Sequence, residues 1–495
     1  MSQVTNSTSA GTESPSQKAY SAKSWDMHKW AMGSGADYWM YSQFANLMLV
    51  FSTDFHLDKR LIGLALCCPR IFDGLIDPLV GHLSDITHTR WGRRRPFLFA
   101  TAILGAFLAV AIWFPSTSWP QWALFTWLTI GATLLFSVWG TYAMAHAAMG
   151  YELSDDYNDR SRVVAIRNVY ASIMAVGGGW YFWGAIQLGK GFSLPIHLAG
   201  WEWTLNMPAV GELTGIRYLS FVAGALVLIC AAIPVFFCRE RFANANRKHV
   251  SLGKACLATL KCRPFVLLLA MQIIRGLGGV AGSMGVFIGI YYVCNGDRGQ
   301  YMGASAGLGS FYGVIMSFIL WPLAKPLTKW IGKRVGLIWS ACTTLVFAIL
   351  LPFITIPGHI YLLVFTGFVF GFLGAFGGVA SAALMPDICD LDELAYGERR
   401  EGLFAAVASC ISKWENSIMM FCGMCLLHYS GFDEALAQQA PGVFTRMRWL
   451  YFTPPIICGL VTLILTLYFP ITEKMMDDVR AQLQKRREAA VTGGT

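Results

Sequence analysis

The chain has 495 residues, of which 55% are hydrophobic and 14% are charged, and its mean hydropathy is +0.50. A soluble domain carries about 25% charged residues, so this composition excludes a soluble protein and indicates a polytopic membrane protein in a lipid bilayer. The net charge of +9 does not indicate a nucleic-acid partner, because the positive residues lie in loops, as orientation signals do.

The N-terminal residues 1–28 are rich in Ser, Thr and Gly at first and carry no signal-peptide core, so we predict a disordered tail. Apolar segments of spanning length follow. The first six are 29–52, 60–86, 97–116, 121–150, 164–188 and 215–238. The second six are 264–293, 300–324, 335–356, 359–386, 403–429 and 447–471. The predicted fold is therefore all-α, with twelve transmembrane helices in two bundles, 29–238 and 264–471. A basic linker, 239–263, joins them, and a tail, 472–495, follows.

Lys and Arg concentrate in alternate loops, such as 90–95, the linker 239–263 and 325–334, whereas the intervening loops hold few. The positive-inside rule then predicts that both termini and the linker lie in the cytosol. We expect an integral, multi-pass protein of the plasma (inner) membrane.

The two halves of the chain resemble each other. Pro78-Leu79 leads to Trp91-Gly92, and Pro322-Leu323 leads to Trp330 at the corresponding place in the second half. Parallel repeats of six spans are the architecture of major facilitator transporters, whose site lies at midplane between the halves. The pattern therefore predicts two six-helix bundles related by a pseudo-twofold axis.

The second apolar segment contains Arg70, Asp73 and Asp77, which share one helical face because their spacings are three and four residues. A charged side chain at mid-bilayer costs about 2.5–3.5 kcal/mol, and two carboxylates one turn apart repel unless a cation or proton lies between them. We interpret Asp73 and Asp77 as a cation site, with a structural ion pair to Arg70 as the alternative.

Asp37 is a buried carboxylate in the first segment, followed by Tyr38 and Trp39. A carboxylate can accept hydrogen bonds from sugar hydroxyls, and an aromatic ring can pack on the apolar face of a sugar. These three residues are therefore candidates for substrate binding. The alternative is an acid at the entry of the helix, near the cytosolic surface.

Three further polar residues lie within or at the ends of apolar segments. Lys413 lies half a span deep and needs a carboxylate partner, for which an acid of the N-terminal half is a better candidate than Glu415. His146 suits proton handling or a sugar hydroxyl, or is structural. Arg167 is expected to contact substrate or to form an ion pair with Glu152.

The pattern Arg70-x-x-Asp73-x-x-x-Asp77-Pro78, followed by Trp91-Gly92-x-Arg94-x-Pro96, resembles the glycoside–pentoside–hexuronide:cation symporters, the family of melibiose permease. The resemblance extends from about residue 29 to 425 and includes Glu152, Arg160, Asp387, Asp390, Arg400 and Lys413. It implies coupling-cation binding by Asp73 and Asp77, and sugar binding by Asp37 and Arg167 with Lys413 near both. We expect gating or structural roles for Arg70, Arg94, Glu152, Arg160, Asp387, Asp390 and Arg400.

The chain departs from melibiose permease at three positions. Ala143 stands where that protein has an acid, Ile76 where it has an amide, and His146 at the place of an aromatic residue. Because sodium needs several oxygen ligands whereas a carboxylate pair can hold a proton, we favour H⁺ over Na⁺ as the coupling ion. The only metal expected is a sodium ion at Asp73 and Asp77.

These features predict a secondary active transporter that moves a sugar or glycoside together with a cation by alternating access. We expect no enzyme activity, no cofactor and no nucleotide partner, and we expect the monomer to function. One alternative keeps the fold but transports an amphipathic, lipid-like substrate. Another is a membrane sensor without transport, which would usually carry a soluble output domain.

Overall fold

The computed structural model describes residues 24–87, 89–92, 94–151, 153, 157–198, 201–238, 261–315, 332–396, 401–436, 438–471 and 473–492. At some of these positions, among them 74–86 and 157–161, only the backbone is described. Asp77 and Arg160 therefore have no described side chain, and Glu152, Arg400 and most of the linker 239–263 lie outside the described residues.

The N-terminal bundle begins with a short helix, α1 (Ser24–Ala31), so ordered structure starts within the tail predicted to be disordered. Its spans are α2 (Gly33–Thr53), α3 (Lys59–Ile86), α4 (Arg95–Ala111), α5 (Gln121–Tyr151), α6 (Tyr157–Lys190) and α7 (Glu212–Phe237). Between α6 and α7 an antiparallel hairpin, β1 (Phe192–Leu198) with β2 (Trp201–Met207), pairs Phe192 with Met207. The hairpin was not predicted.

The C-terminal bundle contains α9 (Arg263–Gly278), α10 (Val280–Phe287), the π-helix η1 (Ile288–Val293), α11 (Arg298–Ile315), α13 (Lys333–Ile354), α14 (Ile360–Tyr396), α15 (Glu401–Tyr429) and α16 (Val443–Leu467). A final helix, α17 (Glu473–Thr492), follows. Each of the twelve predicted segments contains a described helix, and the seventh is divided into α9, α10 and η1. Pro96 and Pro264 stand in the first turns of α4 and α9, where the missing N–H costs no helical hydrogen bond.

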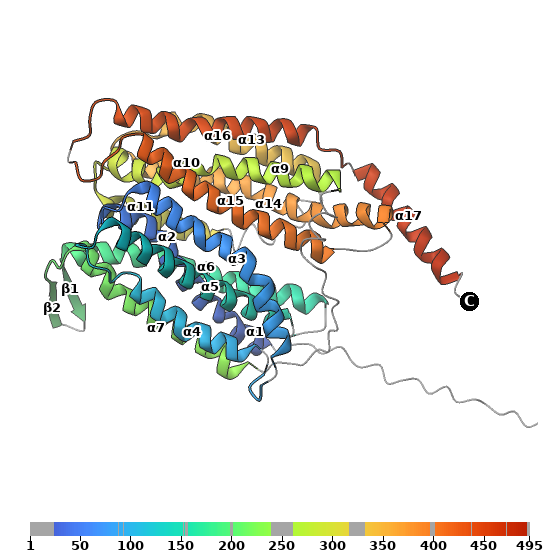
Figure 1. Ribbon diagram of the computed structural model, residues 1–495, viewed down its shortest axis with the longest axis horizontal. Helices are drawn as coiled ribbons and strands as arrows, with labels where there is room; N and C mark the ends of the chain where they lie inside the picture. Colours follow the sequence, from blue (N-terminus) through green and yellow to red (C-terminus); the bar gives the residue numbers. More distant parts are fainter. Residues whose placement is uncertain are drawn as a thin grey trace, which may run out of the picture.

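The two bundles lie one above the other in Figure 1, with the hairpin at the opposite end from α17. Among the described residues, five helices are long and apolar enough to cross a membrane, judged by length and composition only. Others carry charged residues, for example Asp73 in α3 and Lys413 in α15. Charged residues within a span are tolerated where they face protein or an aqueous path rather than lipid.

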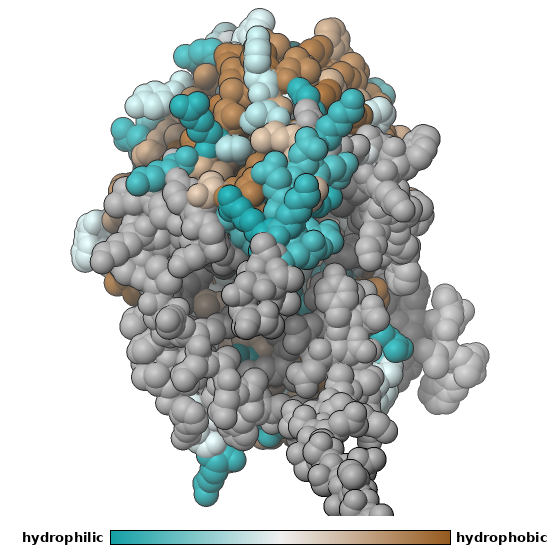
Figure 2. Space-filling view, turned by 90° about the vertical axis from the view of Figure 1, so that its right-hand side faces the viewer, coloured by the Kyte–Doolittle hydropathy of each residue, from teal (hydrophilic) through white to brown (hydrophobic). Residues whose placement is uncertain are grey.

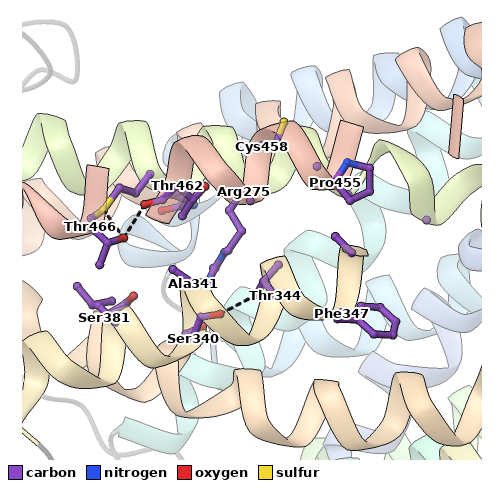
Figure 3. A pocket seen from close by; sticks show the side chains of 18 of the residues that line it. Arg275, Ser340, Ala341, Thr344, Phe347, Ser381, Pro455, Cys458, Thr462 and Thr466 are labelled. Carbon is purple, nitrogen blue, oxygen red and sulfur yellow. Dashed lines mark hydrogen bonds between the residues drawn. The ribbon is translucent and has the colours of Figure 1, made fainter. Parts of the chain in front are cut away.

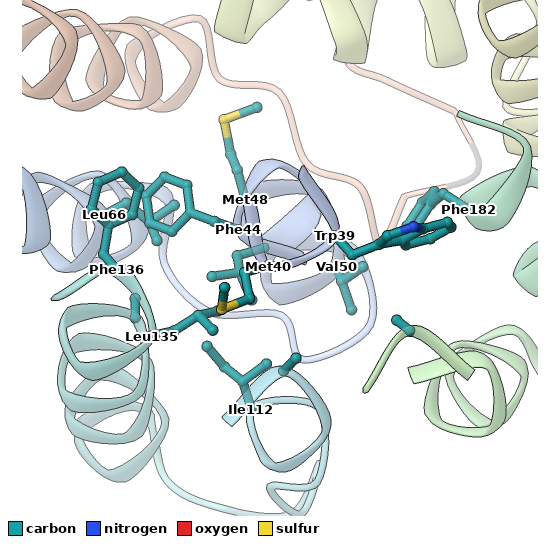
Figure 4. Packing of buried hydrophobic residues seen from close by; sticks show 14 of the residues in the cluster. Trp39, Met40, Phe44, Met48, Val50, Leu66, Ile112, Leu135, Phe136 and Phe182 are labelled. Atoms are coloured by element: carbon teal, nitrogen blue, oxygen red, sulfur yellow. The ribbon is translucent and has the colours of Figure 1, made fainter. Parts of the chain in front are cut away.

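The core of the N-terminal bundle packs around α2. Met40, Phe44 and Leu47 are buried there against α4 and α5, with Phe136 contributed by α5 (Figure 4). The same buried cluster continues into the C-terminal bundle through Met424 and other residues. In Figure 1 α3 runs alongside α15, and α6 also contacts α11, so helices of both bundles form a shared seam.

Helix α17 is amphipathic and packs on the C-terminal bundle. Met476, Val479 and Leu483 are buried at spacings of three and four residues, while Arg480 binds Asp387 of α14. Figure 2, which views the molecule from the end that carries α17, shows hydrophilic side chains gathered beside hydrophobic ones in the described part of the surface. The segment predicted as a tail is therefore a docked helix.

Candidate functional site

Asp73 and Lys413 meet between the two bundles. Asp73 is buried in α3, with 2% of its side chain exposed, and its Oδ2 lies 2.9 Å from Nζ of Lys413 in α15. An ammonium at this distance offsets much of the cost of burying a carboxylate. The prediction that Lys413 pairs with an acid of the N-terminal half is confirmed. The structure does not describe the side chain of Asp77, so the paired-acid site stays a prediction there.

Arg70 lies one turn before Asp73 but packs on aromatic rings. Its guanidinium is 4.0 Å from the ring centre of Phe136 and 5.9 Å from those of Phe44 and Trp139. Cation–π contact of this kind is typical of arginine at a partly desolvated site. Lys413 lies within ion-pair distance of Asp73. Between the described side chains of Arg70 and Asp73 no ion pair within 4 Å is found, contrary to the alternative of a structural pair.

Asp37 forms a second polar cluster, with Arg167 and Trp139. Its Oδ2 accepts a hydrogen bond of 3.2 Å from Arg167 of α6, and its Oδ1 accepts one of 2.6 Å from the indole Nε1 of Trp139 of α5. Three helices of the N-terminal bundle thus hold one carboxylate. Arg167 thus pairs with Asp37. Its contact with substrate stays a prediction, and its alternative partner Glu152 lies outside the described residues.

Tyr38 and Trp39 follow Asp37 in sequence but face α6. The hydroxyl of Tyr38 donates to the carbonyl of Ala175 at 3.3 Å, and Trp39 is 6% exposed and meets Tyr181 edge to face. Figure 4 shows Trp39 directed toward Phe182. Successive helical residues point about 100° apart, so the two rings cannot share the direction of Asp37. In this conformation both rings pack against α6, and their place in a binding site stays a prediction.

His146 is fully buried and does not join either cluster. Its Nε2 lies 2.8 Å from the carbonyl of Trp30, its own carbonyl accepts a 2.8 Å hydrogen bond from Trp30 Nε1, and the two rings stack. Gly33 makes this close approach possible, because a Cβ there would meet the imidazole. His146 therefore attaches α1 to α5, as the structural alternative predicted, and its contact with substrate stays a prediction.

Among the predicted gating residues, Asp387 lies at the end of the molecule that carries α17. Asp387 is buried and binds both Lys333 at 2.6 Å and Arg480 at 2.9 Å. Asp390 lies on the same helix one turn on, and Arg94 precedes α4. The structure thus places Asp387 in a link between α13, α14 and α17, whereas the roles of Asp390 and Arg94 stay predictions.

At the opposite end, ion pairs join the bundles. The guanidinium Nη1 of Arg298 in α11 lies 3.0 Å from carboxylate oxygens of both Asp54 and Glu212. Asp54 directly follows α2, and Glu212 is the first residue of α7. A second bridge joins Lys59 of α3 to Glu434 at 2.6 Å. Sequence reasoning did not single out these residues, because each lies in a short loop or at a helix end that is distant in the chain from its partner.

A model of the MFS/sugar transport protein family matches residues 30–473. The chain belongs to this family. Its relatives include the inner membrane symporter YicJ of Escherichia coli strain K12, 26% identical over 92% of this chain and 95% of the relative. Another is the isoprimeverose transporter of Lactiplantibacillus pentosus, which is 24% identical over 90% of this chain and 88% of the relative. The inward-open xylose transporter XylE from E. coli has a similar fold, with 14% identity and a TM-score of 0.55. The match covers 92% of this chain and 98% of XylE.

Membership of the MFS/sugar transport protein family confirms the predicted fold and the predicted resemblance to glycoside–cation symporters. The protein is a membrane transporter and not an enzyme. Sugar symport with a cation is the activity that these relationships support in general. Sequence reasoning did not single out Trp139, which donates a hydrogen bond to Asp37. Its signal was its position one turn before Ala143, where melibiose permease has an acid.

Proposed function

We propose that the protein takes up a glycoside together with a cation, and that the Asp73–Lys413 contact is the centre of the coupling. The supporting observation is a buried acid of one bundle held at 2.9 Å by a lysine of the other. Such a pair responds both to cation binding and to relative movement of the bundles, since either event separates or replaces the ammonium. Asp77, one turn from Asp73, is the second acid of this proposed site.

The coupling follows from charge balance. In this conformation the Lys413 ammonium neutralises Asp73, so an incoming cation must compete with it for the same carboxylate. When Lys413 leaves, two acids one turn apart are stable only with a cation or proton between them. Cation binding then favours the substrate-competent state, and by linkage the substrate tightens cation binding by the same factor.

For the substrate we propose the cluster of Asp37, Arg167 and Trp139. Asp37 and Arg167 supply acceptors and donors for hydroxyl groups, and Trp139 supplies a ring with a polar edge. Substrate hydroxyls would replace part of the Asp37–Arg167 pair. This polar chemistry favours a sugar over the amphipathic alternative. Competition for uptake by free sugars and by lysolipids separates the two, and displacement by lysolipids alone would reverse this choice.

The orientation we propose has both termini in the cytosol, so the bridges of Arg298 and Lys59 close the extracytosolic end. Substrate would then exchange with the cytosol from this conformation. Rocking of the bundles would break these bridges and expose the site to the other side.

We propose H⁺ as the coupling ion, since Ile76 supplies no oxygen beside the two acids. Uptake into proteoliposomes at constant pH, with and without sodium, tests the choice. Equal rates are expected, and sodium-dependent uptake would refute H⁺ coupling.

The decisive experiment for coupling uses Asp73→Asn in proteoliposomes with a labelled glycoside. We expect accumulation against a gradient to be lost while some downhill exchange remains, because only the cation step needs the charge. Asp37→Asn is the matched variant, and it should weaken both processes through substrate affinity. Accumulation by the Asp73→Asn protein would disprove the role.

A further inference from the structure

A cavity of about 480 Å³ lies inside the C-terminal bundle (Figure 3). Its described lining comes from α9, α10, α13, α14 and α16, and so from the C-terminal bundle alone. The cavity is thus distinct from the clusters around Asp37 and Asp73. Its volume falls within the range of small-molecule pockets, about 300–1,000 Å³.

The seventh span is interrupted where it borders this cavity. Helix α9 ends at Gly278 and α10 begins at Val280, and Gly278, Gly279 and Gly282 all line the space. Backbone that is not regular helix is tolerated at membrane depth only inside protein or beside a polar cavity. In transporters, glycine-interrupted spans are a pointer to binding sites. The break therefore marks the cavity as more than loose packing.

Arg275 points into this space from the last turn of α9. Figure 3 shows its side chain extending from α9 toward Ala341 and Thr344 of α13. Among the described residues no hydrogen bond or ion pair within 4 Å engages its guanidinium, although Glu415 of α15 attracts it from the neighbouring face. A guanidinium at mid-span is costly without a partner, so the cavity presents a cation that is free to bind an anion.

The rest of the lining is mainly apolar with a few hydroxyl groups. The apolar lining includes Phe347, Leu351 and Tyr451. Ser340 and Thr462 lie near Arg275 (Figure 3). Thr462 Oγ1 is buried and has no hydrogen-bond partner in the described part of the chain. A ligand with an apolar body and one small polar head would match this arrangement.

We propose that this cavity binds an amphipathic carboxylate, with its head on Arg275 and its apolar body between Phe347, Leu351 and Tyr451. A carboxylate can accept two parallel hydrogen bonds from one guanidinium and matches its single charge. A phosphate monoester carries nearly two charges, which one arginine already attracted by Glu415 would leave partly uncompensated. The site does not depend on the glycoside site, and it adds a second ligand to the transporter.

The test uses the full chain in lipid nanodiscs and titrates it with dodecanoate, dodecanol and dodecyl phosphate. Arg275→Gln should weaken dodecanoate binding at least tenfold and leave dodecanol binding unchanged, because only the charge is removed. Gly282→Leu should weaken both, since Gly282 lines the cavity, a Cβ there meets nothing within 4 Å, and a leucine would occupy part of the space. Gly309→Leu on α11 is the matched control, because Gly309 also has open space and does not line the cavity.

Glu415→Gln should change the affinity for dodecanoate in the opposite direction. Removing the competing carboxylate should tighten dodecanoate binding, an outcome that a damaged fold would not produce. Unchanged dodecanoate affinity in both Arg275→Gln and Gly282→Leu would overturn the site, and tighter binding of dodecyl phosphate than dodecanoate would overturn the choice of head group. Glycoside uptake is measured in a separate assay, so the binding results would still test this site if the coupling proposal failed.

Discussion

Lys59, the first residue of α3, and Glu434, in the loop after α15, form an ion pair of 2.6 Å between the two bundles. Their side chains are 10% and 6% exposed, and Ser52 donates to the other oxygen of Glu434 at 2.9 Å. A pair this well shielded loses much more than a surface pair when one partner is removed, because the remaining charge stays buried. It is therefore a main contributor to the contact between the bundles at the end of the molecule opposite α17, which we propose is the extracytosolic end.

Glu434→Gln should open this end more often. Removing one member of a buried pair costs about 3 kcal/mol or more, and the loss falls on the closed conformation alone. Hydrogen–deuterium exchange of residues 430–436 should accelerate, and the unfolding temperature should fall. Asp297→Asn is the control, because its pair with Lys190 is 51% and 40% exposed, and such pairs contribute about 1 kcal/mol or less. Equal effects of the two variants would contradict this assignment.

Lys413→Ala should abolish accumulation of substrate and destabilise the protein. It leaves Asp73 buried without its ammonium partner, at a cost of about 3–5 kcal/mol for a fully buried pair. The double variant Asp73→Asn with Lys413→Gln should recover thermal stability without recovering accumulation. Thermal unfolding and uptake measured on the same preparations check this, and an active Lys413→Ala protein would refute it.

Trp139→Phe should raise the KM for the glycoside about tenfold while the maximal rate changes little. The variant keeps a ring beside Arg70 but loses the hydrogen bond to Asp37, and a hydrogen bond to a charged group contributes about 1.5–3 kcal/mol. Trp127→Phe is the matched control in the same helix, since Trp127 donates only to the carbonyl of Ile112. Initial uptake rates over a range of glycoside concentrations provide the measurement, and the same KM in both variants would exclude a role for Trp139.

His146→Ala should reduce stability and leave substrate affinity of the folded protein unchanged. The variant loses the stacked contact with Trp30 and leaves a cavity in a fully buried site, which for a large side chain costs about 3 kcal/mol. Tyr142→Phe should cost less, because it removes one hydrogen bond to the Gly33 carbonyl. Thermal unfolding together with glycoside binding distinguishes the outcomes, and a changed affinity in His146→Ala would restore the predicted contact with substrate.

The positions of the spans could be predicted from the sequence alone. Apolar length determines where a helix can cross the bilayer, and this condition is local, so the predicted segments and the described helices nearly coincide. The exception at the C-terminus has a tertiary cause. Residues 473–492 are polar overall, and only the docking of Met476, Val479 and Leu483 on the bundle explains why they form an ordered helix there.

The identities of the charged residues in the spans were also evident in the sequence, because the bilayer makes each of them costly. Their partners were not. Asp73 meets Lys413 rather than Arg70, and Asp37 meets Trp139 while Trp39 turns away. Pairing depends on how helices far apart in the chain are rotated and set against each other, and no local pattern contains that information. The sequence by itself therefore determined which residues needed neutralisation, and the tertiary structure decided which groups provide it.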